Sequence, residues 1–204
     1  PDHTPFFEEC IVKVVGEAVG NMFPARISAG TRTFPQLGFN RLIIRKDGKA
    51  RESWVGDEHY NVENPERIPF GPVDPEVGVI KVEDMQGNAR AIVMSYAMHA
   101  DLGCFSYEIS ADYPGFACKK VEEAFDNKAI CLFVAGGGGN VEGLMISRRR
   151  SGPDDPIKTD YKPIQRTGEL LGIEVIKLAN ALHASSDNTS FKMRTDSLQF
   201  STRG

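Results

Sequence analysis

The segment from Ala91 to Gly115, AIVMSYAMHADLGCFSYEISADYPG, contains the pattern around which this 204-residue chain is organised. Its first part, Ala91 to Ala97, is an almost uninterrupted apolar run that follows a turn, which predicts a buried strand. His99 comes directly after this strand, at the end where open α/β sheets bind their ligands. The pair Asp112-Tyr113 then precedes Pro114, a residue favoured at the first position of a helix. The segment therefore predicts a strand, a loop with polar side chains and a helix.

The residues that follow extend this pattern to a second strand end. The helix is expected to run from Pro114 to about Phe125, and an apolar strand from Ala129 to Val134 comes next. A strand, helix, strand order implies a right-handed crossover between parallel strands. The second strand ends in four glycines, Gly136 to Gly139, and Asn140. The two strand ends are therefore expected to border one cleft of an α/β fold.

Helices are also expected at both ends of the chain. Thr4-Pro5 is a helix start, and the apolar residues after it recur at helical spacing, which predicts one buried face. That face consists of Phe7, Ile11, Val14, Val15, Ala18 and Met22. The last helix is expected to bury Ile164, Leu171, Val175, Leu178 and Leu182.

The remaining strands and loops follow from turn signals. A strand is predicted from Ala25 to Phe34. Two hairpins are predicted from their turns: 42–45 with 50–55, around an Asp-Gly pair, and 77–82 with 89–97, around a turn that contains Asn. Residues 56–72 and 141–163 are predicted as long polar connections, the first of them bordering the cleft. Short edge strands are expected at 191–193 and 198–200.

Length and composition favour one globular domain over residues 1–204, and the order of strands and helices predicts that it is α/β. The hydrophobic fraction is 41% and the charged fraction 25%, as in ordinary globular proteins. No apolar run approaches the roughly 20 residues that span a bilayer. A net charge of −4 gives no electrostatic footprint for nucleic acid. Four cysteines without CxxC spacing exclude a zinc knuckle or a dense disulfide framework, and they leave the compartment open.

Several polar residues could carry chemistry, and each has a structural alternative. His99 could be a metal ligand or a hydrogen-bonded structural histidine, because spacing supplies no second ligand. Asp112 could serve the cleft or only cap the helix. Arg41 could be an active-site cation or a surface charge. The glycines could let a substrate approach the backbone, through positive φ angles and missing side chains, or form a flexible turn.

Five blocks of the sequence, taken together, resemble neutral/alkaline non-lysosomal ceramidases and their bacterial relatives. In chain order they are Asn40-Arg41, DPEVGVI at 74–80, the strand ending in His99, ISADYPG at 109–115, and the strand ending in Gly136 to Asn140. The similarity extends from about Pro1 to Leu182. It implies a layered mixed β-sheet flanked by helices, as part of a longer catalytic domain.

The resemblance also implies a zinc-dependent amidase that cleaves the N-acyl bond of ceramide. By this correspondence His99 matches a zinc-binding histidine and Arg41 matches an arginine that lines the active site. Pro1-Asp2 resembles the end of an HTHSGPD motif, so the other histidine ligand is expected upstream and further ligands downstream of Gly204. Gly137, Gly138, Gly139, Asp112 and Tyr113 are then expected to contact the substrate. A secreted or periplasmic location is slightly favoured.

The glycine loop departs from the family motif. Ceramidases have GDxSP there, with the serine as proposed nucleophile, and many bacterial relatives have GDINP. This chain has Gly139-Asn140-Val141-Glu142-Gly143 instead. The Asn140 amide can donate to an oxyanion but cannot act as a base. Glu142 could act as a general base, or it could lie on a solvated loop.

The sequence therefore predicts a Zn²⁺-dependent hydrolase of an N-acyl amide in a sphingolipid-like substrate, with Arg41, Asn140 and Glu142 as catalytic residues. Two alternatives stay open. One is a catalytically inactive relative that binds a lipid or glycan, and the other is a hydrolase of a different amide or ester. The oligomeric state is left open.

Overall fold

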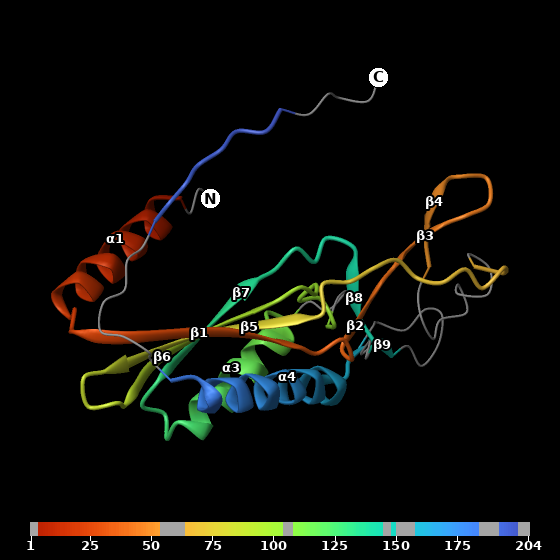
Figure 1. Cartoon of the computed structure of the whole chain (residues 1–204). Coiled ribbons are helices and arrows are strands. Elements are labelled where there is room, and N and C mark those ends of the chain that lie inside the picture. The colour runs from red at the N-terminus through yellow and green to blue at the C-terminus, as the bar shows by residue number, and fades with distance from the viewer. Residues whose placement is uncertain are drawn as a thin grey trace.

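A four-stranded mixed sheet forms the centre of the molecule (Figure 1). The computed structural model describes residues 4–53, 64–103, 108–144, 148–149, 158–183 and 192–199. The strand order is β1-β5-β6-β7, with β1 and β6 antiparallel to β5, and β7 parallel to β6. The strands are β1 (Ala25–Thr33), β5 (Glu76–Asp84), β6 (Ala89–Tyr96) and β7 (Ile130–Ala135). The predicted α/β class with a mixed sheet is confirmed.

The turn between β5 and β6 explains why these two strands form a hairpin. The Asp84 carboxylate accepts hydrogen bonds from the backbone N–H groups of Gln86 and Asn88, at 3.0 and 2.9 Å. Gly87 has a φ of +85°, a conformation that other residues adopt at a cost. The Asn88 side chain and backbone donate to Asp84 and lower the pKa of this carboxyl group. The local sequence therefore specifies the turn of this hairpin.

Helices α3 (Asp112–Ala124) and α4 (Tyr161–Ala181) cover one face of the sheet. Both were predicted, and their apolar faces form the main core with the inward side chains of β5 and β6. The two helices pack closely at Gly168, where an added Cβ would lie 2.5 Å from the Tyr113 carbonyl oxygen. The Asp160 side chain caps α4 by accepting from the Lys162 N–H.

Helix α1 (Thr4–Gly20) forms as predicted, but its predicted buried face is wrong. None of its residues is buried. Figure 1 shows the helix standing off from the sheet, on the side away from α3 and α4. Its apolar residues repeat at helical spacing but pack against no element of the described part of the chain. None of the described helices is long and apolar enough to cross a membrane.

Three small sheets flank the central one. The predicted hairpin of β3 (Leu42–Ile44) and β4 (Ala50–Glu52) is confirmed. The other two pairs are β2 (Gly38–Asn40) with β8 (Val141–Gly143), and β9 (Arg148–Arg149) with β10 (Lys158–Thr159).

The pairs that include β8 and β9 correct the prediction of an unbroken connection over 141–163. Strand β8 is only three residues long and has a glutamate at its centre. Its partner β2 lies about 100 residues away in the sequence, so no local pattern predicts β8. The predicted edge strands at 191–193 and 198–200 are wrong where the structure describes them, since 192–199 contains no strand. Residues 54–63 of the predicted cleft loop lie outside the described residues.

Candidate active site

Strand β8 is fixed between two segments that are far away in the sequence. It pairs with β2 so that Glu142 lies opposite Phe39. The His99 N–H, just beyond β6, donates to the Val141 carbonyl at 2.9 Å, and the Arg41 N–H donates to the Asn140 carbonyl at 2.9 Å. Backbone hydrogen bonds therefore bring His99, Arg41 and Glu142 to one place.

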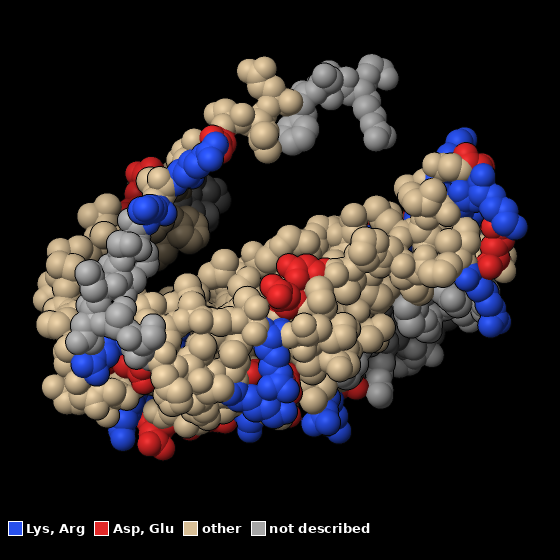
Figure 2. Space-filling view, in the orientation of Figure 1, with Lys and Arg blue, Asp and Glu red and all other residues tan. Residues whose placement is uncertain are grey.

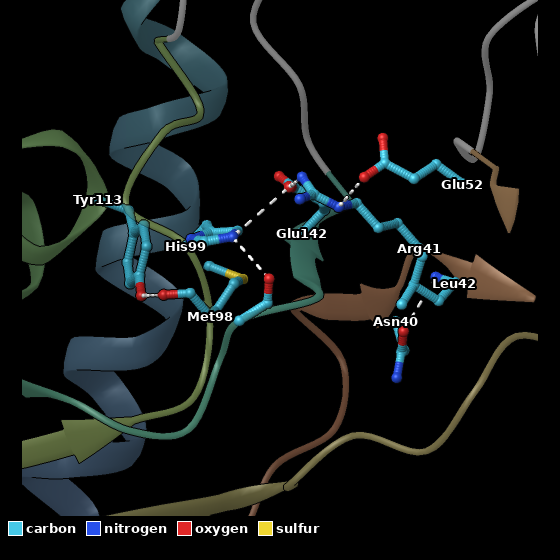
Figure 3. Close-up of polar contacts among 9 residues, drawn as sticks. Asn40, Arg41, Leu42, Glu52, Met98, His99, Tyr113 and Glu142 are labelled. Carbon is cyan, nitrogen blue, oxygen red and sulfur yellow. Dashed lines mark hydrogen bonds and ion pairs between the residues drawn. The ribbon is translucent and has the colours of Figure 1, made fainter. Parts of the chain in front are cut away.

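The side chains of Arg41 and His99 converge on the Glu142 carboxylate (Figure 3). Glu142 is only 2% exposed. Its Oε1 accepts a hydrogen bond from Arg41 Nη1 and lies 4.0 Å from His99 Nε2. Arg41 Nε forms a second ion pair, with Glu52 Oε1 at 3.3 Å. Arg41 is therefore held between two carboxylates, and the solvated-loop alternative for Glu142 is wrong.

The proton on Glu142 is bound more tightly than on an ordinary glutamate. Burial raises the pKa of Glu142 above 4.5, and the charge of Asp101 and a hydrogen bond to it raise it further. Arg41 and His99 oppose this shift without reversing it. A carboxyl group with a raised pKa, next to a second carboxyl group, can hold and release a proton nearer to neutral pH.

His99 lies at the open side of the cluster, with 39% of its side chain exposed. Its Nε2 is 3.1 Å from the Gly139 carbonyl oxygen. A carbonyl oxygen only accepts, so Nε2 donates in this contact, and in the neutral form of the ring the lone pair is then on Nδ1. The ring is thus oriented by the glycine loop on one side and by the buried carboxylate on the other.

Tyr113 and Asp112 support the segment that carries His99. Tyr113 is 0% exposed, and its hydroxyl donates to the Met98 carbonyl at 2.8 Å. Burial raises the pKa of Tyr113, so the hydroxyl stays protonated. The Asp112 carboxylate accepts from the N–H groups of Gly103 and Tyr113, at 2.9 and 2.8 Å. Their predicted contact with a substrate stays a prediction.

Close packing explains Gly138 of the glycine loop, but it does not explain Gly137 or Gly139. An added Cβ at Gly138 would lie 2.8 Å from Met98 N, whereas at Gly137 or Gly139 it would meet nothing within 4 Å. Among the described glycines only Gly48 and Gly87 have positive φ, so the loop does not use the positive φ angles that the sequence led us to expect. Gly137 and Gly139 leave backbone open to an approaching group, and Gly138 packs against the strand end.

Asn140 contributes its backbone to the cluster. Its carbonyl accepts from Arg41, and its side chain is exposed. The sequence reasoning missed Asp101 and Glu52. Asp101 follows His99 by two residues, and this closeness in the sequence could have indicated that Asp101 belongs to the site. Glu52 ends a short hairpin, and no sequence pattern connects it with the site.

The described residues do not by themselves fit a zinc ion. They contain no group of three or more His, Cys, Asp or Glu side chains arranged to hold a metal. A zinc site needs three or four ligands, and catalytic zinc uses three protein side chains. His99 is an available imidazole, but the Glu142 carboxylate beside it is already bonded to Arg41. The zinc prediction therefore rests on the resemblance.

The fold is a mixed-sheet α/β structure with helices on one face of the sheet, and solved structures of ceramidases share it. Neutral ceramidase from Pseudomonas aeruginosa matches with a TM-score of 0.56 at 15% identity, over 84% of this chain and 24% of the ceramidase chain. A ceramidase complexed with C2 matches with a TM-score of 0.52 at 15% identity, over 81% and 23%. The chain thus spans about a quarter of the length of these proteins.

At this identity the likeness shows a distant ceramidase-like fold. No protein-family model matches the sequence, and no curated protein matches it. The activity of the chain must therefore be argued from the cluster of Arg41, His99 and Glu142.

Proposed function

We propose that this protein is a hydrolase that cleaves an N-acyl amide bond in a sphingolipid-like substrate, with the Arg41, His99 and Glu142 cluster as its catalytic centre. The observation that carries the proposal is the burial of Glu142 between a guanidinium and an imidazole. A glutamate is rarely fully buried unless it is paired, because desolvating its charge is costly, and the two groups beside Glu142 can both take part in hydrolysis. The ceramidase-like fold supports the substrate class.

Glu142 is the general base in this proposal. Hydrolysis of an amide needs a group that takes a proton from water as the water oxygen attacks the carbonyl carbon, and a group that returns a proton to the leaving amine. Glu142 can do both in turn, since its raised pKa suits proton transfer in both directions. The products are a carboxylic acid and an amine, so the atoms balance with water as the second reactant.

Arg41 supplies a fixed positive charge for the oxyanion. Its guanidinium is held by Glu52 and Glu142, so it need not reorganise as negative charge develops on the carbonyl oxygen. Asn140, with its exposed side chain, is proposed as an additional amide donor. The exposed backbone of Gly137 and Gly139 is proposed as the surface against which the substrate lies.

Dependence on Zn²⁺ is a separate part of the proposal, with His99 as the ligand contributed by these residues. When bound, zinc would lower the pKa of a coordinated water. The other ligands would come from outside the described residues.

The test is an assay with an N-acyl amide that releases a fluorescent amine, on protein purified without chelator. We expect Glu142→Gln to lower kcat by about 10²–10⁴-fold, as loss of acid–base catalysis does. His99→Ala removes the proposed zinc ligand beside Glu142 and should also lower kcat. His183→Ala, which removes an exposed histidine elsewhere, is the matched control and should keep full activity. Metal content measured on the same preparations tests zinc separately.

Other outcomes assign other functions. If His99→Ala and Glu142→Gln leave turnover unchanged, the catalytic centre is wrong. If the protein binds ceramide vesicles without turnover, the non-catalytic alternative holds, and turnover of small acyl esters but not ceramide indicates a different substrate. If an active protein contains no metal, zinc dependence is rejected and hydrolysis stands.

A further inference from the structure

The face of the central sheet opposite α3 and α4 is apolar and open. Side chains alternate between the two faces of a strand. In β7, Cys131 is buried on the side of the helices, so Ile130, Leu132 and Val134 point to the opposite face. Ile130, Leu132 and Val134 are 64%, 52% and 52% exposed. A hollow of about 530 Å³ on this face is lined by residues of all four strands, none of them charged. Strands with apolar residues on both faces are typical of sheets that are covered on both sides.

Helix α1 presents a second apolar surface above the same face (Figure 1). Phe7, Ile11 and Val14 are 60%, 62% and 63% exposed. Figure 2 shows that the space between this helix and the body of the molecule is bordered mostly by residues other than Lys, Arg, Asp and Glu. Two apolar surfaces therefore border one gap.

The apolar surface of α1 is too wide for a single neighbouring layer. At 3.6 residues per turn, the apolar positions from Cys10 round to Val12 and Val19 extend over more than half of the helix circumference, and Glu8 is the one charged residue within this arc. A helix that packs on one layer needs an apolar stripe of roughly 100°. Closure of α1 onto the sheet would therefore leave part of its apolar surface in water.

We propose that the open face of the β1-β5-β6-β7 sheet is the docking surface for a further apolar layer of the same protein, from polypeptide outside these 204 residues, inserted between the sheet and α1. Such a layer would bury both apolar surfaces at once, which is favourable at about 25 cal/mol per Å² of apolar area. The length of a structurally similar protein supports the choice of further polypeptide as this layer, since the chain covers only 24% of the Pseudomonas aeruginosa ceramidase. The proposal does not depend on the proposed catalytic activity.

The test measures how fast a thiol on this face reacts with a maleimide. Leu132→Cys places the thiol on the open face, and Leu198→Cys places a matched thiol at a site that is 79% exposed and lies off the sheet. Peptide mass spectrometry follows each cysteine separately, so the exposed native Cys10 reports on α1 in the same sample. Val134→Cys replaces Leu132→Cys if the first variant does not fold.

In the 204-residue chain we expect the thiol at position 132 to react with the maleimide at a rate within about tenfold of the rate at position 198, at every protein concentration. In the full-length protein, positions 132 and 10 should both be slowed by about tenfold or more, as buried groups are, while position 198 keeps its rate.

Three results would overturn the proposal. Slow reaction at position 132 in a monomeric 204-residue chain would mean that α1 closes on the sheet. Slowing that increases with concentration, with dimers in sedimentation, would mean that a second copy covers it. An unchanged rate in the full-length protein, or a gene that encodes no further polypeptide, would leave no layer to dock.

Discussion

Glu142 is the residue whose environment departs most from what its neighbours in the sequence suggest. In the chain it follows a glycine-rich loop, where a glutamate would ordinarily be solvated. In the folded protein it is buried, bonded to Arg41, and close to His99 and Asp101. The consequences of this placement can be measured through the proton that Glu142 binds.

The raised pKa of Glu142 predicts a specific pH dependence of stability. The folded state binds this proton more tightly than the unfolded state, so its stabilising contribution is fully present below about pH 4.5 and is lost as the pH rises through the raised pKa. Glu142→Gln is neutral at every pH and should not show this loss. We expect the free energy of unfolding of the wild type, relative to the variant, to fall as the pH rises above about 4.5 in urea denaturation.

Asp101→Asn is the control for the second cause of the shift. It removes the neighbouring carboxyl group, so the pH dependence should become weaker but persist, because burial is the larger cause. Parallel pH profiles for the wild type and Glu142→Gln would show that Glu142 titrates as an ordinary glutamate.

Among the elements, the contact between α3 and α4 shows how a single position sets the distance between two helices. Gly168 lies inside α4, where glycine is unfavourable by about 1 kcal/mol relative to alanine. The structure explains its presence, because a Cβ there would lie 2.5 Å from the Tyr113 carbonyl oxygen and 2.6 Å from Phe116 Cβ. Close packing at this point also holds Tyr113, whose hydroxyl supports the segment before His99.

Gly168→Ala is therefore expected to lower the free energy of unfolding by about 1–3 kcal/mol, the usual cost of overpacking, in spite of the better helix propensity. Gly16→Ala is the matched control in α1, where an added Cβ meets nothing within 4 Å. It should increase helicity in circular dichroism without lowering the unfolding midpoint. Equal effects of the two substitutions would mean that the α3–α4 contact is looser than the structure shows.

At the scale of the whole molecule, one side of the sheet is a complete core and the other side is an open surface. The core between the sheet and the helices α3 and α4 contains fully buried residues such as Leu171 and Val175, whereas α1 has none. Most of the buried apolar side chains of the described residues therefore belong to one layer contact.

Deletion of residues 4–20 is expected to change the thermal unfolding midpoint of the 204-residue chain by less than about 4 °C, which corresponds to less than about 1 kcal/mol. Leu171→Ala, which truncates a fully buried side chain of α4, should cost about 2–5 kcal/mol and is the reference. A fall after the deletion as large as that of Leu171→Ala would show that α1 packs on the folded core in solution.

Elements with strong local signals could be predicted from the sequence. The helices α3 and α4, the strands β5 and β6 with their Asp84 turn, and the β3–β4 hairpin all have hydrophobic periods or turn residues that act over a few positions. The placement of His99 at a strand end followed from the same patterns. The buried face predicted for α1 failed because periodicity shows that a helix has an apolar face, and not what covers it.

The sequence by itself determined the α/β class, the strand that ends before His99 and the glycine loop beside it, since these depend on hydrophobic pattern and turn chemistry within short windows. Only the tertiary structure decided that Glu142 is buried against Arg41 and His99, because the backbone bonds that place it join residues far apart in the chain. It also decided that one face of the sheet is open. Burial and pKa depend on what surrounds a side chain in space, and those neighbours come from distant parts of the sequence.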